Sequence, residues 1–157
     1  MNILDQIHWT NGFVPVADAW DDSGGAVTTD VVEVRSAVGL FALIHKGAGA
    51  TGTFLVTALA CDDATPTTTA AVAFWYRVCT TFDTWGAWTH ATTAGFTSTA
   101  GANQMYQIFV PAAEVAANGY GYCQLSFTEP VDNPCTGGVA LGVIQTRYQD
   151  TTTTMLT

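Results

Sequence analysis

The chain has 157 residues, of which 48% are hydrophobic and 11% charged, and its formal net charge is −9 at pH 7. Nucleic-acid binding depends on clustered Lys and Arg, so a chain with 4 basic and 13 acidic residues is not expected to bind nucleic acid. For the same reason, it is not expected to bind an anionic membrane surface. Ordinary soluble domains carry about 25% charged residues, so we expect other protein subunits to cover part of this surface.

The N-terminal residues 1–13 lack the basic start, long apolar stretch and cleavage site of a secretory signal, so we expect synthesis in a cytoplasm. They carry apolar side chains that have no evident strand partner in the sequence. Such a segment is typical of an arm that orders against a neighbouring subunit. The interface residues that we expect here are Ile3, Leu4, Ile7, Trp9 and Phe13.

From residue 14 onward, short runs with a two-residue period alternate with turns rich in Gly, Pro, Asp and Thr. This spacing predicts a single all-β domain over 1–157, an antiparallel, jelly-roll-like β-sandwich. Pro111 and the Asn118-Gly119 stop predict one short helical turn near 111–118, and 149–157 is expected to be a polar tail. The predicted strands are 14–20, 29–36, 39–46, 53–61, 71–79, 86–92, 104–110, 122–127 and 139–148.

The stretch HKGAGATG at 45–52 has the G-x-G-x-x-G spacing of a dinucleotide-binding loop. That mechanism requires a helix after the last glycine, because the helix N-terminus binds the pyrophosphate. The run TFLVTALAC that follows has β-branched residues and a two-residue period instead. We therefore interpret the glycines as the turn of a β-hairpin and expect no nucleotide.

Exposed aromatic residues are the second feature that could support an interface. The run FWYRV at 74–78 places Trp75 and Arg77 on the face opposite to Phe74 and Tyr76, and DTWGAWT adds Trp85 and Trp88. These tryptophans could fill the core of a sandwich, anchor a protein interface or stack on a sugar ring.

The sequence contains no grouping that indicates catalysis, so we predict no enzymatic activity, no cofactor and no metal site. The Ser residues lack a nucleophile elbow, and a cysteine with a distant His90 is a chance pattern. The pairs Asp21-Asp22 and Asp62-Asp63 fit turns, with a loop calcium ion as the alternative. The four cysteines have no C-x-x-C spacing, and we favour reduced thiols over disulfides.

Several runs together resemble a group of small virion proteins of tailed bacteriophages, which are encoded beside the major capsid protein. The resemblance spans roughly residues 30–145 and rests on the following runs: HKGAGATGTFLVTALACDDATP, FWYRV, DTWGAWT, AGFTSTAGANQMYQIFVPA, NGYGYCQLSFTE and NPCTGGVALGVI. It implies a capsid decoration or cement protein on the outer surface of the virion head, with the major capsid protein as partner. It supplies no site residues.

The composition agrees with such a protein, which would be made in the host cytoplasm and bury apolar surface against the shell and its own copies. We expect a homo-oligomer, in particular a trimer, because local threefold points occur where three capsid subunits meet. A tail-associated subunit and a carbohydrate-binding β-sandwich that uses exposed Trp remain the alternatives.

Overall fold

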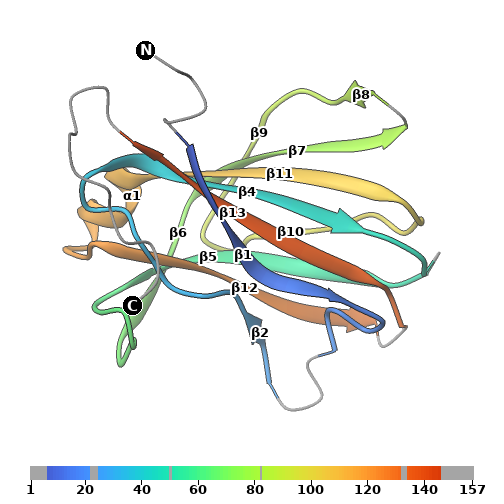
Figure 1. The fold of residues 1–157 in the computed structure, drawn as a ribbon, viewed down its shortest axis with the longest axis horizontal. Coiled ribbons are helices and arrows are strands. Elements are labelled where there is room, and N and C mark those ends of the chain that lie inside the picture. The colour runs from blue at the N-terminus through green and yellow to red at the C-terminus, as the bar shows by residue number, and fades with distance from the viewer. Residues whose placement is uncertain (1–6, 22–24, 50, 82, 132–133, 146–157) are drawn as a thin grey trace.

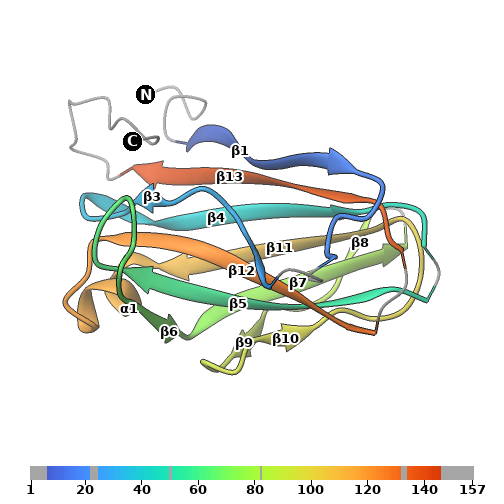
Figure 2. The ribbon, with the colours of Figure 1, turned by 90° about the horizontal axis from the view of Figure 1, so that it is seen from below.

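A computed structural model describes residues 7–21, 25–49, 51–81, 83–131 and 134–145. These residues form two antiparallel sheets that pack as a sandwich, with strands running along the long axis of the molecule (Figures 1 and 2). The predicted all-β sandwich is therefore confirmed. The elements are β1 (Ile7–Val16), β2 (Val27–Thr28), β3 (Val32–Glu33), β4 (Ala37–Lys46), β5 (Thr53–Cys61), β6 (Thr69–Val72), β7 (Phe74–Thr81), β8 (Thr84–Trp85), β9 (Thr89–Ala91), β10 (Phe96–Thr97), β11 (Gln104–Pro111), α1 (Ala112–Ala117), β12 (Tyr122–Val131) and β13 (Gly137–Gln145).

The first sheet has the strand order β1-β13-β4-β11-β7-β8, with β9 also paired to β7. The second sheet has the order β10-β5-β12-β2, with β3 also paired to β12 and β6 to β5. Long strands thus form the centre of both sheets, and most of the edges are strands of two to four residues. The exception is β1, a ten-residue edge strand that lies outside β13 (Figure 2).

The sandwich core follows from the alternation of side chains along the strands. On β5 the side chains of Phe54, Val56 and Ala58 are fully buried, whereas their neighbours Leu55 and Thr57 are half-buried on the outer face. The bounds of β5 match the predicted strand at 53–61, because an unbroken two-residue period marks this segment in the sequence.

Aromatic rings occupy the centre of the core. Trp20 is fully buried and its ring lies 4.4 Å from that of Phe54 and 5.0 Å from that of Phe127, measured between centroids. Phe13 completes this cluster with edge contacts to Trp20 and Phe127. Burial of several large rings in one cluster is a major source of stability for a sandwich of this size.

The helical turn is confirmed at α1, which connects β11 to β12 at one end of the sandwich (left in Figure 1). Val115 buries its side chain in the core, and the backbone N–H of Gly119 donates to the carbonyl of Ala116, with Gly119 at φ +80°. No helix in the described part of the chain is long and apolar enough to cross a membrane.

The four cysteines are free and buried: Cys61, Cys79, Cys123 and Cys135. Burial raises the pKa of Cys61 to about 11, with Asp62 adding to the shift, and it also raises the pKa of Cys123. Reactive cysteines have a low pKa and access to solvent, so these two thiols are unreactive core groups.

The strand prediction fails where the chain changes sheet. The segment 71–79 is expected as one strand, but β6 ends at Val72 in the second sheet and β7 begins at Phe74 in the first. The glycine loop after β4 is likewise no hairpin turn, because β4 and β5 belong to different sheets. A local period cannot show which sheet a strand joins, since that depends on partners distant in sequence.

The N-terminal part of the chain differs from the prediction in three further places. Residues 7–13 are not a free arm, since they form the first part of β1 and pair with β13. The strand expected at 14–20 ends at Val16, and the strand expected at 29–36 is reduced to Val32–Glu33. Residues 1–6 of the expected arm and the expected tail at 149–157 lie outside the described residues.

The Asp62 side chain stabilises the turn that follows β5. Its carboxylate accepts hydrogen bonds from the backbone N–H groups of Thr67 and Thr68 and from the Thr67 hydroxyl. These bonds lower the pKa of Asp62, that with the Thr67 side chain most strongly. Among the described residues, no group of three or more His, Cys, Asp or Glu side chains is placed to hold a metal ion.

The loop between β4 and β5 gives a stability prediction. Gly49 has φ +114°, and a Cβ there would lie 2.6 Å from the carbonyl oxygen of Pro134 and 2.8 Å from the Cα of Cys135. Gly25 has a similar φ of +119° but no atom within 4 Å of the Cβ position. Both substitutions place an alanine at a positive φ, but only the Gly49→Ala methyl group clashes with neighbouring backbone atoms. We therefore expect Gly49→Ala to lower the free energy of unfolding by about 1–3 kcal/mol more than Gly25→Ala does. Urea denaturation of both variants measures the difference, and equal losses would contradict the contact seen at Gly49.

Candidate functional site

The outer face of the first sheet carries a row of aromatic side chains. The register places Trp9 on β1 opposite Gly142 on β13, and Gly142 opposite Phe41 on β4. The row continues from Phe41 to Phe109 on β11 and from Phe109 to Trp75 on β7. We call these four aromatic residues, together with Trp88 and Ile144, the aromatic face.

Alternation along the strands places this row outside the core. Leu40 and Ala42 flank Phe41 and are fully buried, and Ile108 and Val110 do the same for Phe109. Because successive side chains in a strand point to opposite faces, Phe41 and Phe109 point away from the second sheet. Several strands of the first sheet thus have apolar residues on both of their faces.

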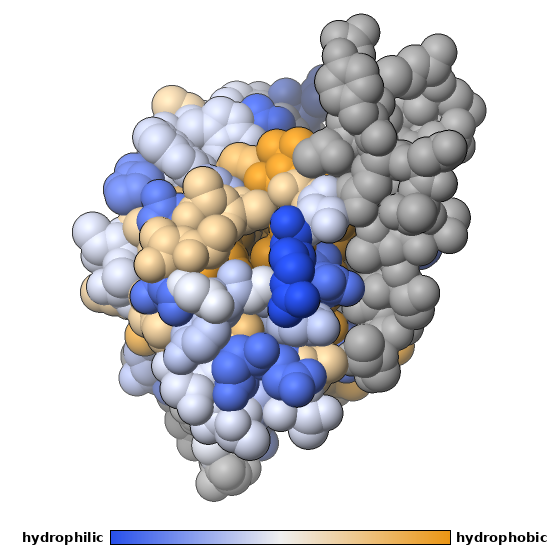
Figure 3. Space-filling view, turned by 90° about the vertical axis from the view of Figure 1, so that its left-hand side faces the viewer, coloured by the Kyte–Doolittle hydropathy of each residue, from blue (hydrophilic) through white to orange (hydrophobic). Residues whose placement is uncertain are grey.

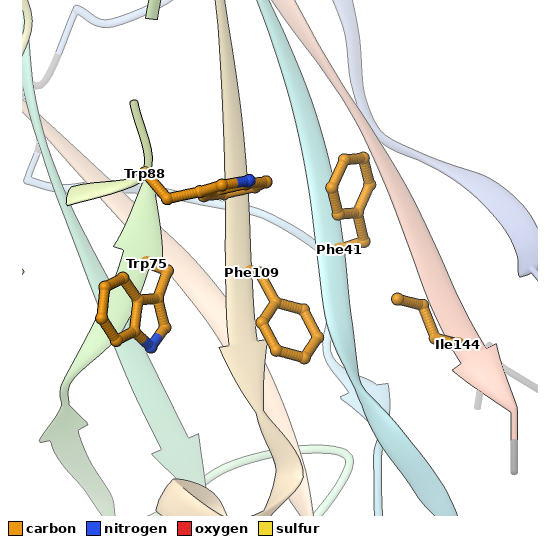
Figure 4. A pocket seen from close by; sticks show the side chains of 5 residues that line it. All are labelled: Phe41, Trp75, Trp88, Phe109 and Ile144. Atoms are coloured by element: carbon orange, nitrogen blue, oxygen red, sulfur yellow. The ribbon is translucent and has the colours of Figure 1, made fainter. Parts of the chain in front are cut away.

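The aromatic face contains an open groove of about 430 Å³. In Figure 4, Trp75 and Trp88 lie on one side of the groove, Phe41 and Ile144 lie on the other, and Phe109 lies between them. All five lining side chains are apolar or aromatic. Volumes of this size are typical of binding sites, but such sites for small polar molecules also contain several convergent polar groups.

The tryptophans at the ends of the row expose much of their surface. Trp9 is 47% exposed, and Trp75 and Trp88 are each 41% exposed. Seen from the end of the molecule that carries α1, hydrophobic residues gather above the centre of the surface (Figure 3). Exposed large apolar groups that form a contiguous patch are typical of protein interaction sites, whereas scattered ones are not.

Two tryptophans are held in place by a single cation. The guanidinium carbon of Arg77 lies 4.9 Å from the ring centroid of Trp85 and 4.8 Å from that of Trp88. The Arg77 Nε–H donates to Oε1 of Gln107 at 2.6 Å, which fixes the guanidinium on the neighbouring strand. Stacking of this kind orders Trp88 beside the groove before any partner binds.

Glycine at position 142 allows the row to extend to the edge of the sheet. A Cβ there would lie 2.8 Å from Cγ2 of Ile7 and 3.1 Å from Cε3 of Trp9. The Trp9 indole therefore lies over the backbone of β13 and meets Phe41 edge-on, with centroids 5.8 Å apart.

The charge distribution separates the aromatic face from the acidic remainder of the protein. The five long strands β1, β13, β4, β11 and β7 contain no Asp or Glu, although the chain has 13 of them. Their basic residues are Arg77 on the outer face and Lys46, which is buried and donates to the carbonyl of Thr99. Burial lowers the pKa of Lys46.

The outer face of the second sheet has a different composition. Its central pairs join Thr57 to Ser126, Leu59 to Gln124 and Leu55 to Thr128. Hydroxyl and amide groups thus accompany each apolar residue, and two of these polar side chains, Gln124 and Ser126, are themselves buried.

The expected interface residues fall into three groups. Ile7, Trp9, Trp75 and Trp88 lie on the outer face of the first sheet, and Trp85 stacks beside them on Arg77. Phe13 is partly buried and packs against the core rings of Trp20 and Phe127, away from the aromatic row. Ile3 and Leu4 lie outside the described residues.

Sequence reasoning missed Phe41, Phe109 and Ile144, which line the groove between the tryptophans. Each belongs to a run that is apolar at nearly every position: GLFALI, YQIFV and VALGVI. Such continuous runs are consistent with strands buried on both faces, and this signal was available in the sequence.

No family model and no curated protein matches this chain. Among solved structures, the chain is similar to the SPBc2 prophage-derived protein YomS, with 11% identity and a TM-score of 0.43 over 87% of this chain and 92% of that one. It is also similar to the protein of infectious bursal virus-derived T=1 particles, with 9% identity and a TM-score of 0.29 over 90% of this chain and 40% of that one.

The arginine stack gives the prediction for this site. If the Arg77 guanidinium stabilises Trp88, the double variant Arg77→Ala/Trp88→Ala will lose less stability than the sum of the losses in the two single variants. We expect a coupling energy of about 0.5–1 kcal/mol, measured by a double-mutant cycle in urea. Trp75→Ala in place of Trp88→Ala is the control, since no ring contact joins its indole to Arg77 in the described structure. Additive losses for the Arg77 and Trp88 pair would contradict the stack.

Proposed function

We propose that the protein is a structural subunit of a virion and that it attaches to neighbouring protein subunits through the aromatic face. The observation that carries this proposal is a sheet with apolar side chains on both of its faces, of which the second sheet covers only one. An apolar patch of this kind has a lower free energy when protein covers it than when water does.

The chemistry of the groove favours a protein over a sugar as the bound molecule. A sugar ring can stack on Trp75 or Trp88, but its hydroxyl groups also need hydrogen-bonding side chains beside the ring. The five residues that line the groove provide none apart from the indole N–H groups of the two tryptophans. An apolar surface of a protein partner makes no such demand.

Charge supports attachment at this face as well. With a net charge of −9, copies of the protein repel one another and any other acidic surface over most orientations. The strands of the aromatic face carry no acidic residue, so a contact made there brings together the fewest like charges.

The resemblance to head-associated virion proteins leads us to place the contact on the outer surface of a capsid, where the protein acts as a decoration or cement protein and the major capsid protein is the partner. The role is structural rather than enzymatic. Several copies that bind together hold the shell more tightly than one contact does. The threefold order expected from the symmetry of a shell stays a prediction, and attachment to the tail is the alternative.

Capture on shells tests this function. We expect Trp88→Asp to reduce co-sedimentation with undecorated shells of the same virus at least about tenfold, because the charge must be desolvated in an apolar contact. Thr97→Asp is the matched control: it adds the same charge on an exposed residue of the second sheet and should bind like the unchanged protein.

Two results, one from the capture assay and one from the composition of purified heads and tails, would contradict the proposal. Binding of Trp88→Asp at the level of the unchanged protein would exclude the aromatic face as the attachment surface. Absence of the protein from purified heads, with its presence in purified tails by mass spectrometry, would assign it to the tail.

A further inference from the structure

The free edge of β1 is the second surface of this protein that lacks a partner in the described structure. The edges of the second sheet are β2, β3, β6 and β10, which have two to four residues each. The opposite edge of the first sheet is covered by β8 and β9, of two and three residues. β1 has ten residues and pairs only with β13.

Edge strands of soluble proteins are usually protected against pairing with another chain. Common devices are short length, charged side chains, Pro and β-bulges. The first half of β1, Ile7–Asn11, has none of these: it contains no Asp, Glu, Lys or Arg, and its register with β13 is regular. An unprotected edge indicates that pairing there is part of the function.

The second half of β1 is protected. The register shifts after Asn11 and again after Phe13. The carbonyl of Gly12 accepts a hydrogen bond from the N–H of Asp30, and Pro15 has no N–H to donate. The segment open to a new strand is therefore Ile7–Asn11, and its central residue is Trp9.

We propose that two copies of this chain pair antiparallel along Ile7–Asn11, about a twofold axis that passes beside Trp9. The pairing places Ile7 opposite Asn11 of the second copy and Trp9 opposite its equivalent. Residues directly opposite each other in an antiparallel pair have Cβ atoms about 4.5–5.5 Å apart, and aromatic pairs at such positions stabilise the sheet.

The symmetry of this contact favours a second copy over another partner. Because the segment is centred on an exposed Trp9 and carries no charge, self-pairing buries two indoles together without bringing acidic groups opposite one another. A twofold axis perpendicular to the sheet keeps both outer faces on the same side. The two aromatic rows then form one continuous surface across the dimer.

This inference shares Trp9 with the aromatic face but uses the edge of β1 and not the groove, on which the capture test of the proposed function depends, so the two can fail separately. It predicts an even-numbered assembly, whereas the trimer expected from shell symmetry needs a different contact. Sedimentation equilibrium of the full chain at micromolar concentration should give twice the chain mass. A mass of one chain or of three chains would overturn the proposal.

Substitutions identify the surface that forms the dimer. We expect Trp9→Lys to give the mass of one chain, because two ammonium groups would lie opposite each other across the axis. Trp75→Lys is the matched control at the far end of the same aromatic row and should keep twice the chain mass. Dissociation by Trp75→Lys, or retention of the dimer by Trp9→Lys, would overturn pairing at the β1 edge.

Cross-linking checks the register without depending on the Lys variant. Under mild oxidation, Trp9→Cys should form a covalent dimer, since the two residues lie directly opposite each other. Thr10→Cys should not, because position 10 lies opposite position 8 of the second copy. Circular dichroism of all variants shows that the sandwich is folded, and equal cross-linking at the two positions would exclude the proposed axis.

Discussion

A sheet with two apolar faces must have both of them covered, and the architecture of this protein follows from that constraint. In β4, β11 and β13, apolar residues occupy nearly every position, so no orientation of these strands presents a polar side. The second sheet covers the inner face and forms the core around Trp20. The outer face keeps Phe41, Phe109 and Trp75 beside a groove that no described segment fills.

The two sheets therefore have different tasks. The outer face of the second sheet pairs each apolar residue with one that carries a hydroxyl or amide group. The first sheet presents an aromatic surface on which Arg77 stacks against Trp88. The low content of charged residues in the chain is concentrated in the first sheet, whose long strands contain no Asp or Glu. Attachment at this face and pairing at the β1 edge would together cover the apolar surface that a lone copy exposes.

The sequence predicted most strands but not how they are distributed between the sheets. β5 and α1 were found because their signals are local: a two-residue period in one case and Pro111 with Asn118-Gly119 in the other. The chain passes from one sheet to the other after Lys46 and again at Ala73, and the local residue pattern does not predict either change. Residues 7–13 of β1 were interpreted as an arm because the sequence shows no evident strand partner for them, and their pairing with β13 depends on residues at the opposite end of the chain.

The site could be predicted only in part for the same reason. Trp75 and Trp88 stand out in the sequence because they are rare, large side chains. Phe41 and Phe109 look like ordinary core residues, and only the register places them in one row between the tryptophans. Phe13 shows the reverse case, since the sequence groups it with the expected interface residues and the structure packs its partly buried ring against Trp20.

The central claim is that protein covers the aromatic face in the assembled particle. Hydroxyl-radical footprinting tests it directly, by comparing the oxidation rates of side chains in the free protein and in the virion. Our account predicts that Trp75 and Trp88 are oxidised several times more slowly in the virion, while Tyr122 on the second sheet keeps its rate. Unchanged rates at both tryptophans, or protection at Tyr122 alone, would contradict it.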